Sequence, residues 1–136
     1  MIDIKDLYQW IQPNTCEEII GMNPTALEDA YVSAIGYLAG EIGNIYDLEE
    51  MLPVMKDTHP DLFFMVRVLT ASAFMGSTFA WSTVFTNQYN SVMSTIHRMK
   101  SGTSRMTGAV NKPEPNAIGR IVTNINDYIQ SGKPLI

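Results

Sequence analysis

Apolar residues recur along this chain at intervals of three and four, the spacing that places them on one face of an α-helix. These stripes predict a short helix after Asp3, a long helix after residues 23–25, and a further helix from Thr86. The apolar members are Ile4, Leu7, Tyr8 and Ile11 in the first, Leu27, Tyr31, Ala34, Leu38 and Ile42 in the second, and Tyr89, Val92, Met93 and Ile96 in the third. The pattern therefore predicts an all-α fold.

Residues that satisfy free backbone N–H groups indicate where helices begin. Thr15 with Glu18, and Thr25 with Glu28, have the spacing of capping boxes, in which each side chain accepts a bond from the other residue's backbone. The first box predicts a short second helix. The second box follows Pro24, which suits a starting position because no N–H is needed there, and it predicts the start of the first long helix.

Residues 62–75 are apolar on nearly every face, as expected of a helix that is surrounded by others. Thr58-His59-Pro60-Asp61 precedes this stretch and is typical of a helix start. We therefore expect a small bundle of about four to five helices around a buried central helix at about residues 60–76.

Two connecting segments are less regular. Tyr46 and Asp47 lead into a brief helical turn that we expect to end at Leu52-Pro53. Residues 79–85 have no clean period and remain unassigned.

Residues 62–85 are long enough to test as a membrane span, but Arg67 and seven Ser, Thr and Gly residues favour a buried helix followed by a polar loop. We therefore expect no contact with a membrane.

The composition changes after the third stripe, where Gly102 is expected to end the helix. Residues 101–115 are rich in Ser, Thr, Gly, Lys and Pro, which is typical of a linker. A last helix at about residues 115–131 has the cleanest amphipathic pattern in the chain. We predict a helical body at residues 1–102 and a linker with a C-terminal arm at residues 103–136. The candidate interface on the arm is Ile118, Ile121, Val122, Ile125, Tyr128 and Ile129, with Arg120 beside them.

The balance of acidic and basic residues changes at nearly the same place in the chain. Residues 1–96 hold three Lys or Arg against twelve Asp or Glu, whereas residues 97–136 hold six against two. Such asymmetry indicates head-to-tail contacts between copies or an acidic partner for the basic part. An excess of charge on solvated surfaces is the alternative.

No arrangement of residues predicts catalysis, a metal or a cofactor. His59 and His97 are far apart in sequence and lack the spacing of metal ligands, so we expect a helix-cap His and a surface His. The single Cys16 has no His near it in sequence and allows no internal disulfide. We therefore expect a protein without enzymatic activity, made in the cytoplasm.

The order of these features resembles a known family, the all-helical adaptor proteins of tailed bacteriophages, which act as head-tail connector or head completion proteins. The resemblance covers roughly residues 2–102. It rests on the short Ile4-Lys5-Asp6-Leu7-Tyr8 helix, the long helix of residues 27–38, the connection of residues 46–53, the apolar helix from Leu62, and the Tyr89-Asn90-Ser91-Val92 helix that closes at Ser101-Gly102.

This resemblance implies a virion structural protein in the neck between head and tail, assembled in the host cytoplasm. Family members form rings, commonly of twelve subunits, beneath the portal protein, and DNA passes through the ring during packaging and ejection without sequence-specific binding. A C-terminal arm often grips the portal, and a head-closure or tail protein follows below. The extra residues 76–85 and the helix on the arm depart from the compact form of the family.

Three alternatives remain open at this point. The arm helix could fold back onto its own bundle. The chain could be a small cellular adaptor or regulatory protein that binds nucleic acid through its basic residues 98–120. Third, the chain could be a membrane-associated protein that contacts the membrane through residues 62–85.

Overall fold

The computed structural model describes residues 1–111, and over this range the chain is all-α, as predicted. In chain order the elements are η1 (Ile4–Leu7), α1 (Pro13–Met22), α2 (Ala26–Ile42), α3 (Leu48–Met51), η2 (Leu52–Val54), α4 (Met55–Thr58), α5 (Pro60–Met75) and α6 (Thr83–Ser101). Residues 1–111 contain no β-strand, and the one β-type pairing among them is an isolated bridge between Tyr46 and Asn111.

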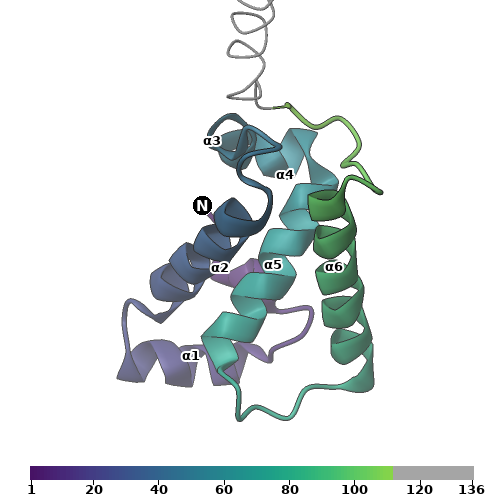
Figure 1. Cartoon of the computed structure of the whole chain (residues 1–136). Helices are drawn as coiled ribbons and strands as arrows, with labels where there is room; N and C mark the ends of the chain where they lie inside the picture. The colour runs from purple at the N-terminus through teal and green to yellow at the C-terminus, as the bar shows by residue number, and fades with distance from the viewer. Residues whose placement is uncertain (112–136) are drawn as a thin grey trace, which may run out of the picture.

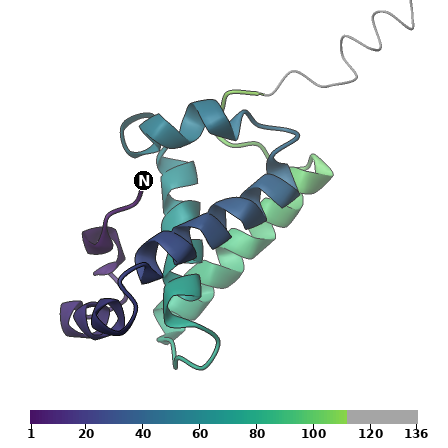
Figure 2. The same cartoon turned by 90° about the vertical axis from the view of Figure 1, so that its left-hand side faces the viewer.

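Helix α5 is the centre of the body, which confirms the predicted buried helix. Figure 1 shows α5 between α2 and α6, and the turned view of Figure 2 shows α2 in front of the other two. Its buried side chains come from all round the helix, namely Leu62, Met65, Val66, Val68, Leu69, Thr70, Ala71 and Phe74. Burying an aliphatic side chain of this size contributes about 1.5–3 kcal/mol, so α5 contributes much of the core.

The helix predicted after Asp3 forms and is capped by Asp3, but it is shorter than expected. Asp3 and Asp6 form a capping box at the start of η1, and the element is a 3-10 helix that ends at Leu7. Ile11 lies beyond η1, although its side chain is buried in the core.

Neither of the two threonine capping boxes forms. Helix α1 begins at Pro13, two residues before Thr15, because proline suits a first helical position, where no N–H is required. Helix α2 begins at Ala26, so Pro24 lies before the helix instead of in its first turn. The Thr25 hydroxyl lies 3.0 Å from Asn23 Oδ1 and 3.1 Å from Asp29 Oδ2, and these local acceptors replace the predicted bond.

The buried face of α2 is rotated slightly about the helix axis from the predicted face. Ala34, Leu38 and Ile42 are buried as expected, whereas Leu27 and Tyr31 are half-buried. Ala26 and Ala30 take their places in the core. Small side chains at these positions let α2 lie close to α5.

The brief helical turn predicted after Asp47 continues further than expected. Asp47 caps α3 by accepting a hydrogen bond from the Glu50 N–H. The chain does not leave the helical conformation at Pro53, because a proline within the first turn of η2 costs no backbone hydrogen bond. Helical turns therefore follow one another from Leu48 to Thr58.

Helix α6 begins at Thr83, three residues before the expected Thr86, because Ser82 caps it by accepting a hydrogen bond from Phe85 N–H. It ends as predicted at Gly102, which has a left-handed φ of 83°. Val92 and Ile96 are buried, while Tyr89 and Met93 are half-buried.

The unassigned residues 79–85 begin in the loop between α5 and α6 and end in the first turn of α6. Their aromatic side chains cluster: the Trp81 ring stacks on Phe85 with centroids 3.8 Å apart, and Phe79 meets Trp81 edge-on. The loop therefore covers one end of the core. None of the helices within residues 1–111 is long and apolar enough to cross a membrane.

Candidate functional site

The predicted interface on the arm lies outside the described residues. Ile118, Ile121, Val122, Ile125, Tyr128, Ile129 and Arg120 all follow residue 111, so this interface stays a prediction. What the structure places is the attachment of the chain that leads to it, residues 103–111, which we call the arm root. The arm root leaves α6 and crosses the end of the body (Figure 1).

The first part of the arm root is bound to the end of α6. The N–H groups of Thr103 and Ser104 both donate to the carbonyl oxygen of Arg98, at 2.9 and 3.3 Å. The left-handed conformation of Gly102 allows this reversal, which satisfies a carbonyl group that the helix itself leaves free. The root therefore starts from a fixed direction.

The far part of the arm root is bound to the corner between α2 and α3. The buried Tyr46 hydroxyl accepts a hydrogen bond of 3.0 Å from the Met106 N–H, and the Met106 side chain is itself buried. Asp47 N–H donates to the Val110 carbonyl oxygen at 2.8 Å, beside the Tyr46–Asn111 bridge. The sequence assigned residues 103–111 to a linker, but they pack onto the body. The predicted division of the chain at residue 102 otherwise stays a prediction.

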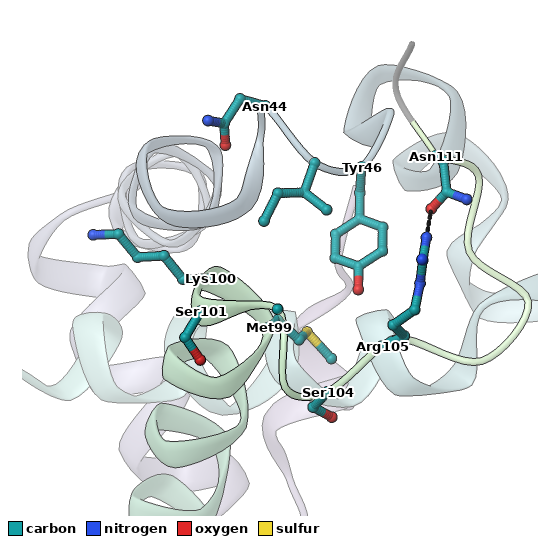
Figure 3. A pocket seen from close by; sticks show the side chains of 10 residues that line it. Asn44, Tyr46, Met99, Lys100, Ser101, Ser104, Arg105 and Asn111 are labelled. Atoms are coloured by element: carbon teal, nitrogen blue, oxygen red, sulfur yellow. Dashed lines mark hydrogen bonds between the residues drawn. The ribbon is translucent and has the colours of Figure 1, made fainter. Parts of the chain in front are cut away.

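A cavity of about 480 Å³ lies between the arm root and the body (Figure 3). Ile45, Tyr46 and Met99 supply apolar walls, and the rim is polar. Lys100 forms an ion pair of 3.1 Å with Glu41, and Arg105 donates a hydrogen bond of 2.9 Å to Asn111 Oδ1. Figure 3 shows the Arg105 side chain extended toward Asn111 beside the Tyr46 ring.

A second hollow, of about 370 Å³, adjoins this cavity, and we call it the α5–α6 groove. It shares Met99, Ser104 and Arg105 with the first cavity. Its floor is apolar, and its polar residues include Arg98, Arg105 and Asp61. The residues that line it are Asp61, Phe64, Met65, Ser91, Val92, Thr95, Arg98, Met99, Ser104 and Arg105.

Three cations of the basic segment 98–120 are therefore brought together near the end of α6. Arg98, Lys100 and Arg105 border one or both hollows, and Arg98 donates a hydrogen bond of 3.3 Å to the Thr95 hydroxyl. Lys100 is in an ion pair, whereas neither arginine is in an ion pair with a carboxylate of residues 1–111. Cations here also complement the negative C-terminal end of the α6 dipole.

The titratable groups that the sequence singled out lie where a structural role is expected. His59 is the N-cap residue of α5 and is buried, and His97 is exposed on α6. Cys16 is fully buried in α1, and this burial raises the pKa of its thiol, which disfavours the reactive thiolate. No group of three His, Cys, Asp or Glu residues that could hold a metal ion occurs within residues 1–111.

Comparisons with models of known protein families, with curated proteins and with solved structures find no match to this chain. Sequence reasoning missed the contacts of Tyr46 and Met106. The available signal was weak: a tyrosine just after a long helix, and one large apolar residue in a run of small and polar ones.

Proposed function

We propose that this chain is a virion structural protein, a head-tail connector adaptor that forms a ring beneath the portal and docks to the portal or to a neighbouring subunit through its C-terminal arm. The observation that carries the proposal is the arm root. Hydrogen bonds at both of its ends fix the course of the chain as far as Asn111, directly before the predicted arm. A protein that acts by gripping a partner needs such an anchored exit.

The charge of the body supports the same function. Nine Asp or Glu residues and no Lys or Arg lie between Lys5 and Lys56, a range that includes all of α1 and α2. Affinity for nucleic acid depends on the neutralisation of phosphates, so an acidic surface does not retain DNA. A channel through which DNA slides requires this property.

The pattern of the arm supports docking. Six apolar side chains between Ile118 and Ile129 recur at helical spacing. Burial of such side chains contributes about 1.5–3 kcal/mol each, which is sufficient to hold an arm on a partner.

The test is capture of the full chain by the portal protein encoded in the same genome. Ile121→Asn combined with Ile125→Asn in the full chain is expected to abolish capture, because both residues belong to the predicted apolar face of the arm. Thr123→Asn combined with Gln130→Asn is the matched control and should be captured normally. Deletion of residues 113–136 should leave a folded body, measured by circular dichroism, that the portal no longer captures. Normal capture of the double variant at Ile121 and Ile125, or an unfolded truncation, contradicts the arm proposal.

The alternative is a small cellular helical protein that binds nucleic acid through residues 98–120. The proximity of Arg98, Lys100 and Arg105 favours it. A gel-retardation series distinguishes the two functions, because phosphate contacts made by these residues must weaken steeply as salt increases. Retardation of duplex DNA that is lost on Arg98→Gln with Arg105→Gln would favour this alternative over the adaptor.

A further inference from the structure

The cations of the body differ in how they are satisfied. Lys56 forms an ion pair of 3.0 Å with Asp6, and Lys100 is paired with Glu41. Arg67 lies over aromatic rings. Arg98 and Arg105 border the α5–α6 groove, and no carboxylate of residues 1–111 forms an ion pair with either. The groove therefore combines an apolar floor with two arginines that an acidic group could engage.

A complementary surface lies on the short helical turns of α3, η2 and α4. Glu50 lies in α3, Pro53 and Val54 lie in η2, and Asp57 lies in α4, at spacings of three, one and three, which are the spacings of residues that share a helix face. All four are exposed, and Val54 keeps 45% of its surface accessible. We call these four residues the acidic ridge. Along the chain, two carboxylates flank an apolar pair.

Within one copy, the acidic ridge does not bind the α5–α6 groove. Figure 1 shows α3 apart from the C-terminal end of α6, with α4 between them. No ion pair joins the ridge to Arg98 or Arg105 within residues 1–111. Both surfaces are therefore open at the same time on the same body.

We infer that the α5–α6 groove of one copy receives the acidic ridge of a second copy of this chain. Pro53 and Val54 meet the floor of Phe64 and Met99, while the ridge carboxylates approach Arg98 and Arg105. Asp61 also borders the groove and restricts where a second carboxylate can lie. The inference specifies the contact between copies that the proposed ring requires and in that respect rests on the proposed function.

Apolar burial and charge have different parts in this contact. An exposed ion pair adds little affinity, whereas opposite charges orient the two surfaces and exclude wrong pairings. The surfaces that meet are different, so the contact is head-to-tail and repeats from copy to copy, and it closes into a ring where the rotation between copies allows it. Charge reversal should therefore act on self-association without affecting the fold.

The test measures self-association of the full chain by sedimentation velocity over a range of concentrations. Arg98→Glu and Glu50→Arg are each expected to weaken self-association by about tenfold or more, because each places like charges across the contact. An equimolar mixture of the two variants should recover association to within about threefold of the wild-type chain, since each variant restores the complementary charge that the other needs. Simple unfolding does not give this rescue.

Glu28→Arg is the matched control: it makes the same charge change on an exposed position of α2 and should leave association unchanged. Single variants that associate like the wild-type chain, a mixture without rescue, or a wild-type chain that stays monomeric would each overturn the inference. Capture by the portal is measured separately on the same variants. Capture by the portal in the arm variants tests the proposed function. Self-association of the ridge and groove variants tests this contact.

Discussion

The guanidinium carbon of Arg67 lies 4.8 Å from the centre of the Trp10 ring, and this pair joins the N-terminal segment to the central helix. The same guanidinium donates to the Asp6 carbonyl oxygen at 3.1 Å and to the Gln9 side chain. Burial lowers the pKa of Arg67, opposed by the nearby Asp6, but an arginine stays charged at any ordinary pH. One cation on an apolar helix is thus held by a ring and by polar groups of another segment.

Replacement of Arg67 should destabilise the body although the residue contacts no ligand. Arg67→Met removes the hydrogen bonds and the cation–π contact, for an expected loss of about 1–3 kcal/mol in the free energy of unfolding. Arg67→Lys should lose nearly as much, because an ammonium group cannot make the planar fork. Urea denaturation measures both variants, with Lys5→Met as the exposed control. Equal stability of the Arg67→Lys variant and the wild-type chain would contradict the role of the planar group.

Tyr46→Phe tests the attachment of the arm root. The variant removes the acceptor of the Met106 N–H and leaves a buried donor without a partner, which costs about 1–3 kcal/mol. Hydrogen exchange should become faster in residues 103–111, while exchange in α5 changes little. Tyr37→Phe removes a hydroxyl from a partly exposed ring and serves as the control. Unchanged exchange in residues 103–111 would mean that Tyr46 does not hold the root.

Much of the fold follows from local pattern, and the site mostly does not. The apolar residues of α5 and the stripe ending at Ile96 are local signals, because helix periodicity and burial on one face are visible within a short window. Thr15 and Thr25 show where such signals fail: a capping box competes with Pro13, Asn23 and Asp29 for the same helix start, and spacing alone does not rank these options.

The sequence gives only a weak signal for the contact between Tyr46 and Met106, because it joins residues 60 positions apart. The grouping of Arg98 with Arg105 was visible as a basic segment, but the apolar floor between them comes from α5. Only the packing of α5 against α6 brings Phe64 to that place. The features that the sequence did not predict are those that depend on long-range packing, and not on the chemistry of individual residues.

Thr70 offers a stabilising substitution. Its side chain is fully buried in α5, and its hydroxyl has no hydrogen-bond partner. Thr70→Val keeps the shape and removes the unsatisfied group, so the free energy of unfolding should rise by about 1 kcal/mol. Thr83→Val, at the exposed first residue of α6, is the control and should have little effect. A lower midpoint of thermal unfolding for the Thr70→Val variant would show that the hydroxyl is satisfied in the protein.

Two glycines should respond to alanine in opposite directions. A Cβ at Gly36 meets nothing within 4 Å, and this residue lies inside α2, so Gly36→Ala should stabilise by about 0.5–1 kcal/mol. Gly102→Ala should destabilise by about 1 kcal/mol, because its φ of 83° is unfavourable for a residue with a side chain. Chemical denaturation of both variants tests the pair, and a change of the same sign in both would contradict the argument.

The buried thiol predicts a loss of stability at alkaline pH. Burial raises the pKa of Cys16 above its ordinary value, so the folded state keeps the proton while the unfolded chain releases it. This contribution to stability is complete below the unfolded pKa of about 8.5 and is lost as pH rises toward the folded value. Urea denaturation of the wild-type chain and Cys16→Ala between neutral pH and about pH 10 should show a shallower decline in the variant. Parallel declines would exclude Cys16 as a source of the stability lost at alkaline pH. Burial also raises the pKa of Tyr31, which accounts for part of the decline that remains in the variant.

The double attachment of the arm root determines where a mechanical load would enter the body. A pull on the chain beyond Asn111 reaches the Tyr46–Asn111 bridge and the Asp47–Val110 hydrogen bond before it reaches Gly102. The load therefore passes first to the corner between α2 and α3, and α6 can keep its last turn wound while tension is borne by α2 and its packing on α5.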